Sequence, residues 1–239
     1  KMEWARMAGV QLEHVVREYT MGRTTIRAVD DISFTIPEGK YTIILGASGA
    51  GKSTVLNILG GMDSPTSGRV TVNGREISGF NKRQLTEYRR ESIGFVFQFY
   101  NLMPNLTVLE NVELASQICK YPLDSRQVLA MVGLGDRLNN FPAQCSGGEQ
   151  QRGAIARALA KNPDVLLCDE PTGALDYQTG KAILALLYDL CKKSRKTVVV
   201  VTHNGALAPT ADVLIRMKSG KIESFEENPS PVPVQELEW

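Results

Sequence analysis

The glycine-rich stretch from Gly46 to Ser53 is the strongest chemical signal in this sequence. One glycine, four further residues and then Gly-Lys-Ser is the spacing of a loop whose backbone N–H groups surround phosphate oxygens. A β-branched and apolar run, Tyr41 to Leu45, precedes it, and apolar residues at helical spacing follow it, so we expect strand, loop and helix. The pattern predicts a nucleotide site but fits kinases, GTPases and ATPases alike. The residues expected to bind the nucleotide here are Gly46, Ser48, Gly49, Gly51, Lys52, Ser53 and Thr54.

Two acidic residues, Asp169 and Glu170, follow the apolar run Val165 to Cys168. Carboxylates at the end of a buried strand suit metal-assisted phosphate chemistry. We expect Asp169 and the Ser53 hydroxyl to hold Mg²⁺ and Lys52 to reach the β- and γ-phosphates. Glu170 is expected to orient and polarise the attacking water. The other interpretation, two acids that cap a turn, is weak beside a phosphate-binding loop.

Three further polar or aromatic residues lie near the ends of predicted strands. Gln98 follows Ile93 to Phe97, where an amide is either a surface cap or a mobile Mg²⁺ ligand. His203 follows the run Thr197 to Val201, and a histidine there can hydrogen-bond a γ-phosphate, although a lone histidine is a weak signal. Tyr19 is either an ordinary strand-end aromatic or a platform on which adenine stacks. The local pattern leaves both interpretations open for each residue.

A second glycine-rich turn begins a predicted helix after Cys145. Ser146 and Glu149 alone make a capping box, which is a purely structural explanation. The two glycines between them cost helix propensity, however, and let a large anion approach the exposed N–H groups of the first turn. A second phosphate-binding element, made of Ser146, Gly147 and Gly148, is the sharper hypothesis. It must either converge with the first loop within one chain or meet it across a dimer.

The elements that position these residues alternate between strands and helices. Residues 10–16 and 32–36 have the two-residue period of half-buried strands and are expected in an antiparallel sheet. This period places His14 on the apolar side, as a packed or partly exposed residue with no assigned role. The pair Asn73-Gly74 predicts a hairpin. A helical block at roughly 100–160 interrupts the alternation and is expected to be an inserted subdomain.

The helical block and the chain ends give the domain boundaries. Thr107 with Glu110 three residues later is a capping box, and a second helix is expected after Asp124. The main domain is expected over residues 7–225. Residues 226–239 mix acids with three prolines and are predicted to be an extended or disordered tail. Residues 1–6 are set outside the domain, as a native extension or as added residues.

The composition restricts the partners. With 239 residues, 43% of them apolar and 22% charged, the chain is predicted to be a soluble globular protein. A net charge of +1 gives no general attraction to nucleic acid, so no nucleic-acid partner is expected. The four cysteines lie far apart in the sequence, which favours reduced thiols over a zinc or redox motif. No segment approaches the roughly 20 apolar residues that span a bilayer, so any membrane role is expected through a partner.

In order and spacing these motifs resemble those of the ATP-binding-cassette (ABC) ATPases over residues 10–225. The resemblance implies an α/β fold of the P-loop NTPase class, with a RecA-like core, an N-terminal antiparallel β-subdomain and an inserted α-helical subdomain. Cys145 stands where the family usually has leucine, and this small apolar side chain is expected to cost little. The implied motifs are Walker A at Gly46 to Ser53, the Q-loop at Gln98, the signature at Ser146 to Gln150, Walker B at Val165 to Glu170, the D-loop at Ala174 to Asp176, the switch histidine at His203 and the adenine-stacking position at Tyr19.

The resemblance also implies the activity, which is hydrolysis of ATP with Mg²⁺ as cofactor. It implies an ATP-dependent homodimer, in which Ser146, Gly147 and Gly148 of one copy close the site of the other, and Asp176 is assigned to nucleotide binding. The implied catalytic residues are Glu170, His203, Lys52 and Gln98, and the implied Mg²⁺ ligands are Ser53, Gln98 and Asp169.

The stretch Arg89 to Leu102, with Leu106 to Val112, is similar to the bacterial subgroup that serves lipoprotein release, macrolide export and antimicrobial-peptide resistance. Members work with a membrane permease that has a large extracytoplasmic domain. The resemblance therefore implies a peripheral subunit at the cytoplasmic face of the cell membrane, with residues 98–108 passing motion to the permease. The alternatives are an ATPase that regulates cell division through a similar permease and a soluble, non-transport ABC ATPase.

Overall fold

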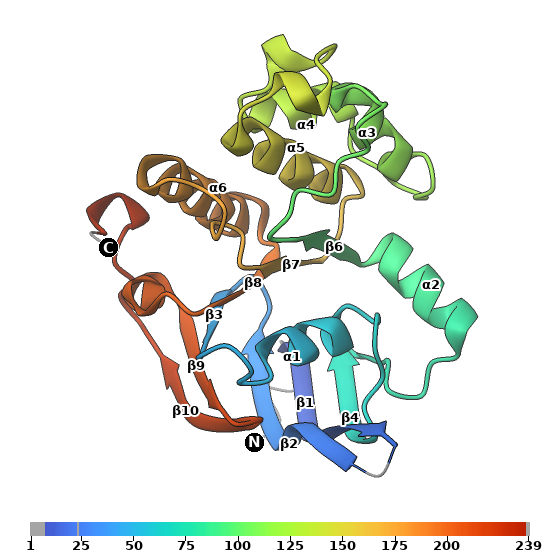
Figure 1. Cartoon of the computed structure of the whole chain (residues 1–239), viewed down its shortest axis with the longest axis vertical. Helices are drawn as coiled ribbons and strands as arrows, with labels where there is room; N and C mark the ends of the chain where they lie inside the picture. The colour runs from blue at the N-terminus through green and yellow to red at the C-terminus, as the bar shows by residue number, and fades with distance from the viewer. Residues whose placement is uncertain (1–7, 23, 238–239) are drawn as a thin grey trace.

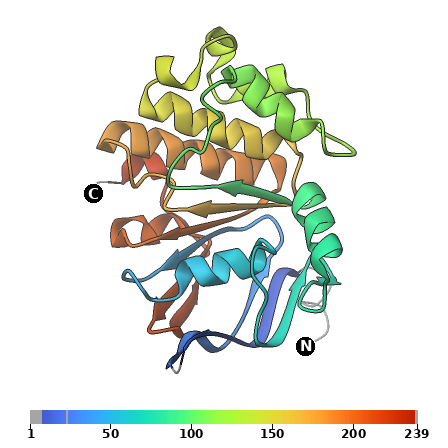
Figure 2. The same cartoon turned by 45° about the vertical axis from the view of Figure 1, so that its right-hand side comes forward.

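The computed structural model describes residues 8–22 and 24–237 and contains two sheets with helices around them (Figure 1, Figure 2). The smaller sheet is antiparallel, with strand order β2-β1-β4-β5. Asn73 and Gly74, between β4 and β5, have φ of +48° and +73°, which is the geometry of a two-residue hairpin and confirms that prediction. The strands of this sheet are β1 (Ala8–Met21), β2 (Thr24–Pro37), β4 (Ser67–Val72) and β5 (Arg75–Glu76).

The larger sheet has the strand order β10-β9-β3-β8-β7-β6. Only β10 runs antiparallel to its neighbour, so the carboxyl ends of the other five strands meet at one edge. In open sheets of this kind, ligands bind at that edge. The strands are β3 (Tyr41–Leu45), β6 (Ile93–Val96), β7 (Val165–Asp169), β8 (Thr197–Thr202), β9 (Val213–Lys218) and β10 (Lys221–Glu227).

Three helices form a separate group between β6 and β7 in the sequence, at the top of Figure 1. They are α3 (Val108–Ser116), α4 (Ser125–Met131) and α5 (Gly147–Ala160). The predicted capping box is present, because Thr107 Oγ1 accepts from the Glu110 N–H and Asp124 caps α4 in the same way. The other helices are α1 (Lys52–Leu59), α2 (Lys82–Glu91) and α6 (Tyr177–Ser194), and the short 3₁₀ turns are η2 (Gly135–Arg137), η3 (Pro142–Gln144), η4 (Gly205–Thr210) and η5 (Val234–Glu236).

Both faces of the larger sheet are covered by apolar core. Alternate residues of β8 contribute to different clusters: Val198 and Val200 to one, Val199 and Val201 to the other. All four are fully buried, which explains why β8 reads as a continuous apolar run. The expected fold class, an α/β cassette with an antiparallel β-subdomain and an inserted helical subdomain, is confirmed.

The position of His14 differs from the prediction. Its side chain is 83% exposed and lies 2.9 Å from Asp31, whereas Leu12 and Val15 are buried. The register of β1 against β2 shifts between Leu12 and Val15, and His14 has φ of +51°. This bulge breaks the two-residue alternation that had placed His14 on the apolar side.

The end of the chain also differs from the prediction of an extended or disordered tail. Strand β10 continues to Glu227, and Val234 and Leu237 of the following segment are 1% and 6% exposed. The carbonyl oxygen of Leu237 accepts from Lys181 Nζ at 2.7 Å and from the Tyr177 hydroxyl at 3.0 Å. Burial of two apolar side chains thus fixes this segment on α6. Residues 1–6 and the last two residues lie outside the described residues.

Candidate functional site

The loop between β3 and α1 takes the curled form that its glycines allow. Gly51 has φ of +97°, and a Cβ there would lie 2.4 Å from the carbonyl oxygen of Ala28. Lys52, the first residue of α1, bends back so that its Nζ donates to Gly46 O at 2.8 Å and Ala47 O at 3.0 Å. The ammonium group is buried in the backbone curve, where a phosphate can replace these carbonyl partners.

The ends of β7 and β8 place two carboxylates and a histidine in the same site. Asp169 ends β7, and the Ser53 hydroxyl donates to its Oδ1 at 3.3 Å. Glu170 follows with φ of +45°, a backbone conformation that non-glycine residues adopt at a cost. Its Oε1 lies 2.8 Å from Nδ1 of His203, which follows β8. Adjacent parallel strands therefore unite residues that the sequence separates widely.

Burial raises the pKa of the Asp169 carboxyl above its usual value. The hydrogen bond from Ser53 opposes this shift, the negative charge of Glu170 adds to it, and the positive charge of Lys52 lowers the pKa again. A cation bound beside Asp169 would favour the ionised form further.

One pocket of about 750 Å³ collects most of the predicted site residues. It lies along the phosphate-binding loop and reaches the ends of β6, β7 and β8. Ala47 and Ala50 of the predicted loop also line it, as does Ala28 of β2, which no pattern in the sequence marked as a site residue. The predicted residues that line the pocket are Ser48, Gly49, Gly51, Lys52, Ser53, Thr54, Gln98, Asp169, Glu170 and His203.

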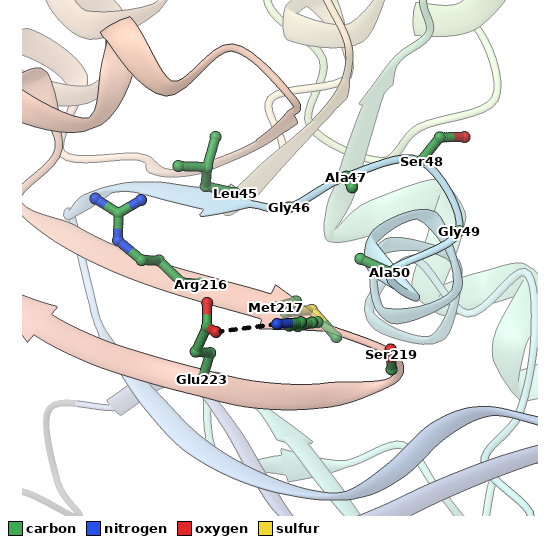
Figure 3. A pocket seen from close by; sticks show the side chains of 11 residues that line it. Leu45, Gly46, Ala47, Ser48, Gly49, Ala50, Arg216, Met217, Ser219 and Glu223 are labelled. Carbon is green, nitrogen blue, oxygen red and sulfur yellow. Dashed lines mark ion pairs between the residues drawn. The ribbon is translucent and has the colours of Figure 1, made fainter.

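The predicted residue Gly46 lines a neighbouring pocket of about 430 Å³ (Figure 3). This pocket lies between the first half of the loop and the hairpin of β9 and β10, and Arg216 and Glu223 point into it. Glu223 pairs with Lys218 at 3.9 Å. A Cβ on Gly46 would lie 2.4 Å from the Met217 carbonyl oxygen, so the glycine lets the loop lie against β9.

The oxygen donors in the larger pocket fit a Mg²⁺ ion that is bound together with phosphates. Ser53, Asp169 and Gln98 offer a hydroxyl, a carboxylate and an amide oxygen. Among the residues that the structure describes, no group of three or more His, Cys, Asp or Glu side chains could hold a metal. This set suits Mg²⁺, which typically takes one or two carboxylates and completes its shell with water and substrate phosphates.

Tyr19 does not line the pocket. Its hydroxyl donates to Asp63 Oδ2 at 2.6 Å, and the Arg17 guanidinium lies 4.5 Å from the centre of its ring. It pairs with Ile26 across β1 and β2, two residues from Ala28, which does line the pocket. The strand pair thus puts Tyr19 near one end of the site.

The second glycine-rich turn does not converge with the first in this chain, since Ser146, Gly147 and Gly148 do not line the pocket. Ser146 caps α5 by accepting from the Glu149 N–H. The glycines have a packing reason that the sequence did not reveal. A Cβ on Gly147 would lie 2.7 Å from the Tyr100 hydroxyl, and one on Gly148 would lie 2.3 Å from Cγ2 of Thr179.

The acidic residues at the starts of α5 and α6 are both stabilised by nearby hydrogen-bond donors. The hydrogen bond from Arg137 and the Ser146 N–H lower the pKa of Glu149 to about 2, so α5 begins with a carboxylate. Asp176, also predicted as a nucleotide contact, caps α6 by accepting from the Thr179 N–H and does not line the pocket. Hydrogen bonds from the side chain and the backbone N–H of Thr179 lower the pKa of Asp176.

A buried polar residue that the sequence analysis did not single out also contacts this region. Gln151 of α5 is fully buried, and its Nε2 donates to Phe97 O at 3.4 Å and to Pro171 O at 2.8 Å. The available signal was a polar residue on the apolar face of a predicted helix. Cys145, which stands where the family usually has leucine, is buried in the core.

Exposed apolar side chains gather along the helical subdomain and the segment that leads to it. Phe99 is 70% exposed and Met103 is 51% exposed. Ile118 and Tyr121, after α3, are 58% and 81% exposed. Among the described residues, no helix has the length and apolar character to cross a membrane.

Comparison with known proteins identifies similar chains. The sequence model of the ABC transporter family matches residues 29–173. An uncharacterized ABC transporter ATP-binding protein of Thermotoga maritima is 47% identical over 222 residues, which cover 91% of this chain and 94% of that protein. The macrolide export ATP-binding/permease protein MacB of Rhodopseudomonas palustris is 44% identical over 223 residues, which cover 90% of this chain but 34% of the longer MacB.

A solved structure extends the similarity to the fold. It is the ATP-binding cassette MJ0796 of Methanocaldococcus jannaschii, a dimer in a post-hydrolysis state bound to ADP and Pi. The TM-score is 0.83 at 43% sequence identity, and the alignment covers 91% of this chain and 98% of that one.

Proposed function

Because this chain belongs to the ABC transporter family, as an ATP-hydrolysing subunit, we propose that two copies close on two ATP molecules and thereby drive a membrane permease. The observation that carries the proposal is the asymmetry of the site. One pocket holds the phosphate loop, both carboxylates, Gln98 and His203, while the turn at Ser146 lies outside it. A second copy is the simplest source of the missing half.

The phosphates are bound by the loop and by Lys52 in this mechanism. The Lys52 ammonium exchanges the carbonyls of Gly46 and Ala47 for β- and γ-phosphate oxygens, and the loop N–H groups donate to the others. Tyr19 stacks on the adenine, which is supported by its pairing with Ile26, two residues from the pocket residue Ala28. Ser53, Gln98 and Asp169 would hold Mg²⁺, which would supply positive charge to offset the charge developing on the phosphates.

The hydrolytic step is assigned to Glu170 and His203. Glu170 accepts a proton from the attacking water, and its 2.8 Å contact with His203 holds these two pocket side chains together. Ser146, Gly147 and Gly148 of the second copy complete the site with N–H groups of the first turn of α5. Asp176 of that copy approaches the same nucleotide.

The partner is proposed to be a permease with a large extracytoplasmic domain, and the work is export or a mechanical action outside the cytoplasm. The relative MacB, a macrolide export ATP-binding/permease protein, supports a permease as the partner. The exposed Phe99 and Met103 lie in the segment 98–108 that follows the pocket residue Gln98. A chain docked there would lie at the cytoplasmic face of the membrane.

Replacement of the base tests the catalytic assignment. A Glu170→Gln chain should bind ATP, become dimeric in ATP and turn over about a hundredfold or more slowly, because general-base catalysis contributes that much. Turnover is measured by phosphate release and dimerisation by size-exclusion chromatography with light scattering. Glu223→Gln, in the neighbouring pocket, is the matched control and should behave like wild type. Normal turnover in Glu170→Gln, or a monomer in ATP, would contradict the proposal.

Recovery of the partner tests the transport assignment. Tagged Glu170→Gln chain held in ATP is purified from gently solubilised membranes, and the proteins that accompany it are identified by mass spectrometry. A permease with a large extracytoplasmic domain is expected. Only soluble or nucleic-acid-associated proteins would instead support a non-transport ATPase.

A further inference from the structure

Gln151 connects the ends of two neighbouring strands inside the protein. Strands β6 and β7 are parallel, and the last pair in their register is Val96 with Cys168. Beyond that pair, the Gln151 amide donates to the carbonyl oxygens of Phe97 and Pro171. One side chain thus bridges the two strands just past the end of their backbone ladder.

The two acceptors directly adjoin residues of the nucleotide pocket. Phe97 precedes Gln98, and Pro171 follows Glu170, and both neighbours line the pocket. Pro171 is buried, so without Gln151 its carbonyl group would lose a hydrogen bond where water is scarce. The bridge therefore fixes the spacing between the segment that carries Gln98 and the segment that carries Glu170.

The orientation of the Gln151 amide follows from its surroundings. The side chain is fully buried, and its Oε1 has no hydrogen-bond donor in the part of the chain that the structure describes. Only the NH₂ group is engaged, because a reversed amide would direct Oε1 at two carbonyl oxygens. The site therefore requires a donor at this position.

Helix α5 connects this bridge to the turn at Ser146. Gln151 lies three residues after Gly148 and four after Gly147, so the three residues share one face of the helix. Gly148 packs directly against Thr179 of α6, since a Cβ there would lie 2.3 Å from Cγ2 of Thr179. A displacement of Ser146 must therefore carry Gln151 with it.

We propose that Gln151 is a positioning residue that holds Gln98 and Glu170 in their reactive places and ties those places to the position of Ser146. The inference rests on the proposed function, in which Ser146 engages the nucleotide of a second copy. Each copy would then sense, through α5, whether its signature turn is engaged, and would adjust its own Glu170 accordingly.

The test compares Gln151→Met, which keeps the size but removes the donor, with Gln127→Met, the same change at an exposed position of α4. Gln151→Met should lower kcat about tenfold to a hundredfold, because small misplacements of reacting groups cost that much, while KM for ATP stays within about twofold. Gln127→Met should match wild type. A kcat within about twofold of wild type for Gln151→Met, or a KM that rises in proportion as kcat falls, would overturn the proposal.

A pH profile separates positioning from packing. In Gln151→Glu the buried carboxyl is ionised at high pH and protonated at low pH, and only the protonated form can donate to Pro171 O. The ratio of its kcat to that of wild type should rise as the pH is lowered from about 8.5 to about 6. The ratio for Gln151→Met should not change with pH. A flat ratio for Gln151→Glu in chains that remain folded by circular dichroism would overturn the donor role.

The link to α5 is tested by combining Gln151→Met with Ser146→Asp. If α5 transmits the position of Ser146 through Gln151, the fold decrease in kcat of the double variant is smaller than the product of the two single-variant decreases. Independent losses would overturn the link. Failure of the dimer proposal is seen separately, as a Glu170→Gln chain that stays monomeric in ATP while Gln151→Met still lowers kcat.

Discussion

Helices α1 and α5 both begin at glycine-rich turns, but of the two only the start of α1 lines the nucleotide pocket. The start of α1 carries its own cation, Lys52, and no acid in its first turn. The start of α5 carries Glu149, whose carboxylate is paired with Arg137, and Ser146 as a helix cap. A glycine-rich turn at the start of a helix is therefore joined to a cation in α1 and to a paired acid in α5.

The difference teaches that a helix N-terminus becomes an anion site through what surrounds it. Both helices offer first-turn N–H groups and partial positive charge. Only at α1 do a loop, a buried ammonium and two strand-end carboxylates converge on the same space. In the proposed dimer, the start of α5 is a half-site that a second molecule completes. Four experiments test this contrast.

The largest effect is expected at α1. Lys52→Ala removes the cation at the start of α1. This change should lower ATP turnover on the order of a hundredfold to a thousandfold and weaken nucleotide binding strongly. Binding is measured with a fluorescent ATP analogue and turnover by phosphate release. Lys218→Ala, an exposed lysine of the neighbouring pocket, is the control and should leave both unchanged. Tight binding by Lys52→Ala would show that α1 does not depend on its cation.

The next effect is expected at α5. Ser146→Asp keeps a good helix cap but adds a negative charge, so the chain should bind ATP normally and turn over about tenfold to a hundredfold more slowly. A mixture of Ser146→Asp and Lys52→Ala chains can form one intact site per mixed dimer. An equal mixture should recover about a quarter of wild-type turnover if chains pair at random. No recovery would contradict a site shared between copies.

Glycine substitutions are expected to have a smaller effect and to differ between the two turns. Gly51→Ala forces a Cβ against the Ala28 carbonyl oxygen at φ of +97° and should lower the free energy of unfolding by about 1–3 kcal/mol. Gly147→Ala meets only the end of the Tyr100 side chain, which can move, so its cost should stay within about 1 kcal/mol. Urea unfolding of both variants measures this. Equal decreases in the free energy of unfolding would contradict a steric difference between the two turns.

The smallest effect is expected from the acid of α5. The pKa of Glu149 is about 2 in the folded chain, below the ordinary value of about 4.3 for glutamate. The carboxylate therefore stabilises the fold above about pH 4.3, and this contribution is lost as the pH falls toward about 2. Glu149→Gln should reduce the free energy of unfolding by under about 1 kcal/mol at neutral pH, since solvent screens the pair. The Tm values of the wild type and of Glu149→Gln should converge as the pH is lowered across this range. A difference in Tm that does not change with pH would contradict the stabilising role of the Glu149 carboxylate.

Local signals in the sequence correctly indicated many of the elements. The hairpin at Asn73 and Gly74 and the capping box of Thr107 with Glu110 depend on residues next to one another, so neighbours in the chain suffice to specify them. The phosphate loop and the acids after β7 were recognisable for the same reason. Their meeting in one pocket followed from the rule that parallel strands end at a common edge.

Contacts between distant residues accounted for the misses. A bulge moved His14 to the surface, and the burial of Val234 and Leu237 ordered a segment rich in prolines. The close packing of Gly148 against Thr179 gave that glycine a role beyond anion access. None of these contacts has a signature within a short window of sequence.

The sequence by itself determined the chemistry of this protein, because a phosphate-binding loop, a strand followed by Asp169 and Glu170, and a capped glycine turn are each written in consecutive residues. Only the tertiary structure decided that the capped turn lies outside the pocket that the other two share. It brought Glu170 within 2.8 Å of His203, left Ser146 outside and placed the Gln151 amide between two strand ends. These distances depend on the register and packing of elements far apart in the chain, which local propensity does not encode.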